Sequence, residues 1–172
     1  MRPKMLLLLI IALALLFAGC AKAPVAEVPK GPSAAEDSAS VRALILDNYV
    51  KAYNAMDADG ILAVMAPEFI WMPPEEPAVT SREALAAWLE KHFNGFKDSG
   101  ATIQYSAAVA GSAVSGDWAY LHLNSVLNST PKKAGKPAEF KGKALVICQQ
   151  QPDGSWKAAR VCWNRDEPPP RS

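Results

Sequence analysis

One side chain in the interior of a predicted strand has the chemistry of a general acid or base. It is His122, and an unperturbed histidine pKa of about 6.5 suits proton transfer near neutral pH. The carboxylates stand outside the strand interiors, with Asp117 and Glu139 at strand ends and Glu68 at the start of a short strand. His122 is therefore the candidate catalytic residue, with a structural histidine bonded to a neighbour as the alternative. His92 is predicted near the exposed end of a helix, where a structural role is the simpler interpretation.

The other residue types that carry chemistry do not form a recognisable site. Two histidines, Cys148 and Cys162 never come within metal-ligand spacing, so no metal site is predicted. No serine or cysteine has a base nearby in a recognisable setting, and no glycine-rich phosphate loop is present. We therefore expect no cofactor. A formal net charge of +1 over 172 residues provides no basic excess for nucleic-acid binding.

Aromatic residues give the better indication of a binding site. In the strand predicted over 117–128, Trp118, Tyr120, His122 and Asn124 alternate with residues that face the core. An aromatic face with polar tips suits a ligand wall, a dimer interface or a plain exposed surface. The predicted ligand pocket comprises Tyr49, Tyr53, Trp71, Trp118, Tyr120 and Asn164. The three from the helical side, Tyr49, Tyr53 and Trp71, also fit an ordinary hydrophobic core.

The elements that must position these residues follow from apolar periodicity. A helix is predicted from about Ser40 to Met56, then a short helix around 61–65 and a short strand over 69–72. Thr80-x-x-Glu83 is a capping box that opens a helix closing near Gly95. Long strands are predicted over 102–111, 117–128, 139–151 and 155–164. Helices first and antiparallel strands after them predict an α+β fold, with the helices packed on one face of a curved sheet.

Cys148 and Cys162 lie in the last two strands, which are joined by a turn at Asp153-Gly154. In that hairpin Cys148 faces about residue 159 and Cys162 faces about residue 145. The two sulfurs are then too far apart for a disulfide, which needs Cα atoms within about 7 Å. We expect two buried free thiols.

The first twenty residues predict export. Arg2 and Lys4 precede an apolar run over 5–18, which is too short for a membrane span and typical of a secretory signal. Cys20 follows Ala18-Gly19, so the segment resembles the signal of a bacterial lipoprotein, although an ordinary signal peptide cut after Gly19 also fits. The lipoprotein resemblance implies lipidation of Cys20 and a membrane anchor, at the outer membrane facing the periplasm if the host has two membranes. The predicted organisation is a signal peptide over 1–19, lipidated Cys20 with a disordered tether over 20–39, one domain over 40–166 and a disordered tail over 167–172.

Several short motifs accompany this order of elements: Asp57-Ala58-Asp59-Gly60, Ala66-Pro67-Glu68, Pro73-Pro74, Arg82-Glu83-Ala84, Gly142-Lys143, Asp153-Gly154-Ser155-Trp156-Lys157 and Trp163-Asn164-Arg165-Asp166. Together, the motifs and the order of elements resemble the SnoaL-like, or ketosteroid-isomerase-like, group of the nuclear transport factor 2-like superfamily. The resemblance covers about residues 40–166 and implies a cone-shaped fold with a pocket between the helices and the sheet. It does not fix an activity, because this fold serves isomerases, dehydratases, binding proteins and assembly domains. Val161 stands where many members carry Asp, which removes a possible pocket carboxylate.

The leading functional hypothesis is a lipid-anchored domain of the cell envelope that binds a small apolar or aromatic molecule without catalysis. One alternative is an isomerase or dehydratase that uses His122 as its base. Another is a dimerising adaptor in an envelope complex. The resemblance also implies a homodimer, because nuclear transport factor 2-like proteins often pair through the outer face of the sheet.

Overall fold

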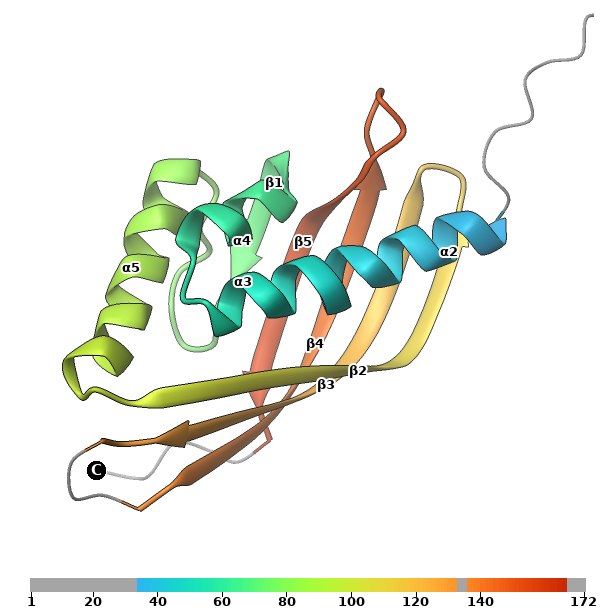
Figure 1. Cartoon of the computed structure of the whole chain (residues 1–172). Helices are drawn as coiled ribbons and strands as arrows, with labels where there is room; N and C mark the ends of the chain where they lie inside the picture. Colours follow the sequence, from blue (N-terminus) through green and yellow to red (C-terminus); the bar gives the residue numbers. More distant parts are fainter. Residues whose placement is uncertain (1–33, 133–135, 167–172) are drawn as a thin grey trace, which may run out of the picture. The chain divides into compact units, whose positions relative to one another are not determined.

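The computed structural model describes residues 34–132 and 136–166 (Figure 1). The predicted signal peptide, Cys20, the first part of the predicted tether and the tail at 167–172 lie outside the described residues. Within the described ranges, no helix combines the length and apolarity needed to cross a membrane. The helical segments are α2 (Ala34–Ala43), the π-helical η2 (Leu44–Tyr49), α3 (Val50–Asn54), α4 (Ala58–Val64) and α5 (Arg82–Asp98). The strands are β1 (Met65–Met72), β2 (Thr102–Ser115), β3 (Trp118–Thr130), β4 (Ala138–Gln150) and β5 (Trp156–Arg165).

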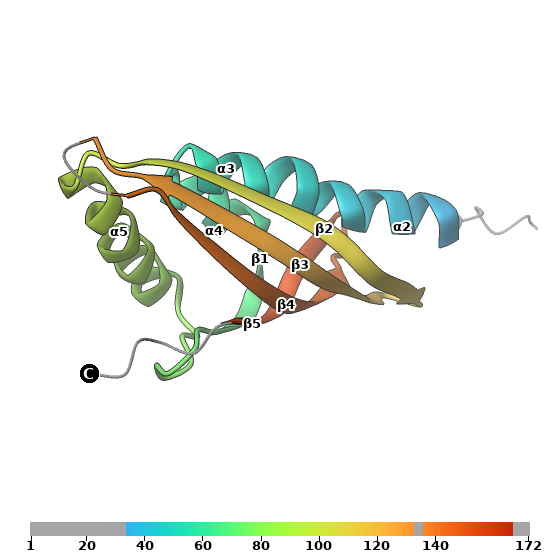
Figure 2. The ribbon, with the colours of Figure 1, turned by 90° about the horizontal axis from the view of Figure 1, so that it is seen from below.

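The strands form one curved sheet in the order β1-β5-β4-β3-β2, and the helices cover one of its faces (Figures 1 and 2). The predicted α+β fold is confirmed. Strands β2 to β5 form antiparallel neighbours, whereas β1 pairs with β5 in parallel. Because β1 is followed by a helix instead of a hairpin, it joins the sheet at the edge formed by the last strand. Pro67 lies where the β1–β5 register shifts, a position at which a missing N–H is tolerated.

The N-terminal helix begins at Ala34, six residues before the predicted Ser40, so residues 34–39 of the predicted tether are helical. Asp37 explains the difference. Its Oδ1 accepts hydrogen bonds from Trp156 Nε1 at 3.0 Å and from Gln150 Nε2 at 3.3 Å. An acidic residue in the first turn also favours the helix through the backbone dipole. The segments α2, η2 and α3 continue one another across the sheet (Figure 1).

Helix α5 begins one residue later than the capping box predicts. Ser81, not Thr80, is the N-cap, and its hydroxyl accepts a hydrogen bond from the N–H of Ala84 at 3.2 Å. The helix also continues past Gly95 to Asp98 and ends where Gly100 adopts a positive φ of 61°. The extra turn brings its C-terminal half alongside the cavity described below.

The two cysteines of the described residues, Cys148 and Cys162, are free, and of these two only Cys148 is buried. Cys162 pairs with Leu145 as predicted, whereas a register shift beside Ile147 pairs Cys148 with Ala158. The prediction that both thiols are buried is wrong for Cys162, because it faces the side of the sheet that the helices leave open. Burial raises the pKa of the Cys148 thiol to about 12.

Candidate functional site

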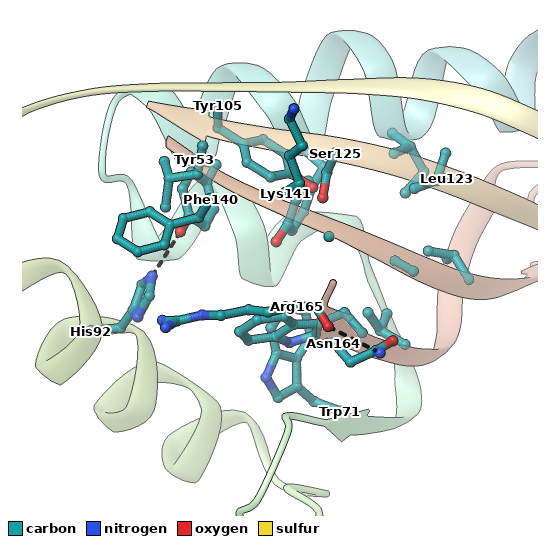
Figure 3. Close-up of a pocket in the computed structure, with 18 of the residues that line it drawn as sticks. Tyr53, Trp71, His92, Tyr105, Leu123, Ser125, Phe140, Lys141, Asn164 and Arg165 are labelled. Atoms are coloured by element: carbon teal, nitrogen blue, oxygen red, sulfur yellow. Dashed lines mark hydrogen bonds between the residues drawn. The ribbon is translucent and has the colours of Figure 1, made fainter. Parts of the chain in front are cut away.

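A cavity of about 190 Å³ lies between the helices and the sheet, and Figure 3 shows many of the side chains around it. Its walls come from η2, α3, α5 and all five strands. An engineered cavity of about 150 Å³ binds benzene, so this volume suits an aromatic molecule somewhat larger than one ring. The aromatic lining residues are Tyr49, Tyr53, Trp71, Trp88, His92, Phe96, Tyr105, Phe140 and Trp163.

Three tyrosines form the wall on the helical side. Tyr49 and Tyr53 are one helical turn apart and therefore share a face, with ring centroids 6.0 Å apart. Tyr105 of β2 packs against Tyr53 at a centroid distance of 4.6 Å. Burial raises the pKa of all three phenols above the usual value of 10.0, so each keeps its proton at neutral pH.

His92 links this wall to α5. Its Nε2 lies 2.7 Å from the hydroxyl of Tyr53, and its ring stacks on Trp88 with centroids 5.0 Å apart. Burial is the main cause that lowers the pKa of His92 below 6.5, and the positive charge of Arg165 acts in the same direction, against Glu76. The imidazole is therefore neutral at pH 7, with one nitrogen as donor and the other as acceptor.

The opposite wall contains two indole N–H groups that have no acceptor in the part of the chain that the structure describes. Trp163 on β5 and Trp71 on the adjacent strand β1 line the cavity. The Nε1 atoms of both are buried and have no hydrogen-bond partner within residues 34–132 and 136–166. Leaving one such buried donor unpaired costs about 1–3 kcal/mol. Trp88 differs, because its Nε1 donates to Glu76 Oε2 at 2.7 Å.

Arg165, two residues after Trp163, carries its charge to the same cavity. Figure 3 shows its side chain extending from the end of β5 with the guanidinium beside His92. The guanidinium carbon also lies 5.0 Å from the centroid of the Phe140 ring, within range of a cation–π contact. No Asp or Glu belongs to the described cavity lining, and the described residues hold no cluster of three metal-ligating side chains.

The structure divides the residues predicted for the site between two faces of the sheet. Tyr49, Tyr53, Trp71 and Asn164 line the cavity. Trp118 and Tyr120 are each 44% exposed and lie on the opposite face, outside the cavity lining. His122, the candidate catalytic residue, is exposed on that opposite face as well, opposite Leu145 of β4. The alternation along β3 therefore carries Leu123, Ser125 and Leu127 to the cavity instead.

Sequence reasoning did not place five important lining residues in the pocket: Trp88, His92, Tyr105, Trp163 and Arg165. A signal for His92 was present, because it follows Trp88 by four residues on the apolar face of α5. The prediction that this helix ends near Gly95 placed His92 in an exposed last turn, whereas α5 continues to Asp98. For Arg165 the signal was alternation along β5, which places Val161, Trp163 and Arg165 on one face.

The sequence matches the family model of the SnoaL-like domain over residues 46–157. Among solved structures, a ketosteroid isomerase-like protein from Erwinia carotovora atroseptica is 23% identical with a TM-score of 0.65, covering 77% of this chain and 98% of its own. An NTF2-like protein with a cystatin-like fold from Novosphingobium aromaticivorans is 19% identical with a TM-score of 0.66, covering 77% and 84%. ActVI-ORFA from Streptomyces coelicolor is 14% identical with a TM-score of 0.64, covering 77% and 99%.

Among curated proteins, none matches this sequence significantly. At identities of 14–23%, the structural likeness shows the fold alone, because one fold serves many activities. The match to the family model spans more than half of the chain, and it agrees with the motifs and with the fold. The protein therefore belongs to the SnoaL-like domain family.

Proposed function

We propose that this SnoaL-like domain binds a small aromatic molecule in its cavity, without turnover, on a lipid-anchored protein of the cell envelope. The aromatic lining of the 190 Å³ cavity is the observation that carries the proposal. Binding sites for small molecules are concave and mostly apolar, with a few polar groups that fix orientation. Here the rings of Tyr49, Tyr105 and Trp163 supply apolar area, and the phenol and indole groups supply the polar contacts.

Calorimetric titration with 2-naphthamide, a neutral two-ring probe, tests this binding. The cavity should take up the probe, and Ala144→Leu should weaken binding about tenfold or more because the added side chain fills part of the cavity that Ala144 lines. Ala87→Leu makes the same change on the exposed surface of α5 and should leave the affinity unchanged. Equal affinities in both variants would place the probe elsewhere on the protein and count against the proposal.

A second candidate function, an isomerase or dehydratase, has one specific observation in its favour. Tyr53 and His92 form a hydrogen-bonded pair in the cavity wall, and a neutral imidazole can accept a proton. This pair replaces His122 as the candidate base, because His122 is exposed on the opposite face. Binding remains the better-supported function, because the described cavity lining has no carboxylate and the Nε2 of His92 is already engaged by Tyr53.

The anchor and the oligomeric state complete the proposal. Cys20 after Ala18-Gly19 supports lipidation, which would hold the domain at the membrane surface. A homodimer through the outer face of the sheet is supported by the exposure of Trp118, Tyr120 and Leu145, at 44%, 44% and 47%. Large apolar side chains gathered on one exposed face are typical of an interaction surface. An adaptor role would use this same face.

A further inference from the structure

Two hydrogen-bond donors of the cavity wall have no acceptor among the described residues. The indole N–H groups of Trp71 and Trp163 are buried and unpartnered within the described part of the chain. Both belong to the wall formed by β1 and β5, where Trp71 pairs with Val161, two residues before Trp163. Buried N–H groups normally have a partner, so two orphans in one cavity wall point to a ligand that brings acceptor atoms.

The charge around the cavity has one sign. Arg165 lines it from the same wall as the two indoles, and its guanidinium has no carboxylate partner among residues 34–132 and 136–166. The nearest carboxylate in sequence, Asp166, accepts from Lys143 Nζ at 2.7 Å. Lys141, the other cation of the lining, is paired with Glu139 at 3.3 Å on the surface. The acceptor that suits this wall is therefore an anion.

We propose that the ligand is an aromatic carboxylate, with its ring among the tyrosines and its carboxylate on the wall of Trp71, Trp163 and Arg165. This inference rests on the proposed binding function and names the class of ligand. An ionised carboxylate has two oxygens and about four lone-pair positions, which match a guanidinium and two indole N–H groups. Charge-assisted bonds of this kind are stronger than bonds to a neutral amide.

Calorimetry on the purified protein in detergent tests the inference with a matched pair of probes, 2-naphthoate and 2-naphthamide. The protein should bind 2-naphthoate at least about tenfold more tightly, since a hydrogen bond to a charged group contributes more than one to a neutral group. Arg165→Gln should remove most of that preference while the amide binds as before. Lys97→Gln removes an exposed charge of α5 that is not in the cavity lining and should keep the preference. Trp163→Phe retains a ring and deletes one donor, so it should weaken naphthoate binding by about threefold to tenfold.

Results of two kinds would overturn the inference, and they differ in what they imply for the proposed binding function. If the wild-type protein binds both probes equally, or if Arg165→Gln weakens both by the same factor, the carboxylate assignment is wrong and the binding function stands. If neither probe binds, the binding function is wrong and this inference is wrong with it. Because Arg165 is exposed, its substitution should leave the fold intact, which circular dichroism checks.

Discussion

The hydroxyl of Tyr53 and Nε2 of His92, 2.7 Å apart, join α3 to α5 across one end of the cavity. Tyr53 is 8% exposed and His92 is half-buried, so this partly buried bond fixes two aromatic side chains relative to each other. His92 therefore contributes to the packing of the fold and also titrates within it, so the stability of the protein should depend on its protonation.

The stability of the domain should fall as the pH falls below about 6.5. The pKa of His92 is lowered in the folded protein, so the unfolded chain binds its proton at a higher pH than the folded one does. Stability therefore rises with pH between the two pKa values and is lost as the pH drops toward the folded one. Urea unfolding between about pH 5 and pH 8 measures this slope.

His92→Gln should flatten that slope, because it removes the group whose proton affinity changes on folding. The matched control is His122→Gln, which removes the exposed histidine on the other face and should leave the slope due to His92 in place. An unchanged slope in His92→Gln would show that another group causes the acid sensitivity.

The protein should show no turnover on cyclic ketones or on aldol-type substrates. Proton abstraction needs a base held at the substrate, and the described cavity lining offers His92, already bonded to Tyr53, and no carboxylate. Steady-state assays with the wild-type protein and His92→Gln check this. A measurable rate that drops about a hundredfold in the variant, the usual scale for losing a general base, would make the protein an enzyme.

Leu145→Glu should convert a dimer to a monomer. Leu145 is 47% exposed on the outer face beside His122, and a charge there would be desolvated in an interface. Analytical ultracentrifugation measures the change. Ala87→Glu places the same charge on the exposed surface of α5. This control variant should sediment with the same mass as the wild-type protein. A wild-type protein that sediments as a monomer at all concentrations would contradict the proposed homodimer.

Cys20→Ala should release the protein from the membrane or leave it unprocessed, because the proposed lipid attachment needs the Cys20 thiol. Membrane fractionation and the mass of the mature N-terminal peptide measure the effect. Cys162→Ala, which removes an exposed thiol of the folded domain, is the control and should fractionate like the wild type. A Cys20→Ala protein that is still processed and still membrane-bound would exclude the lipoprotein interpretation.

In the Cys20→Ala background, a thiol reagent should modify Cys162 in the folded protein and Cys148 only after denaturation. Cys162 is exposed, whereas Cys148 is fully buried and its pKa is raised to about 12, so little thiolate is present. Counting thiols before and after adding denaturant gives the result. An intact mass lower by two hydrogens, with no thiol reacting in denaturant, would show a disulfide between Cys148 and Cys162. Such a result would contradict the strand register described above.

Local sequence patterns predicted most of this fold, since alternation and helical spacing report directly on which faces are buried. They failed at two kinds of position. Gly95 predicts a helix end, but the positive φ that ends α5 is at Gly100, so the helix continues to Asp98 and His92 is not in its last turn. Alternation correctly assigns Leu121 and Leu123 to the core face, but the aromatic set with Trp118 and Tyr120 suits a ligand wall as well as an outer surface, so the pattern did not exclude these two residues from the pocket.

The parallel pairing of β1 with β5 also determines when the cavity is completed during folding. Trp71 of β1 pairs with Val161 of β5, so the wall that carries both indoles is built from segments far apart in sequence. Contacts between such distant segments form late, because closing the intervening loop costs entropy before any contact stabilises it. The cavity therefore acquires its full wall last, and truncation of β5 would remove the binding site along with the edge of the sheet.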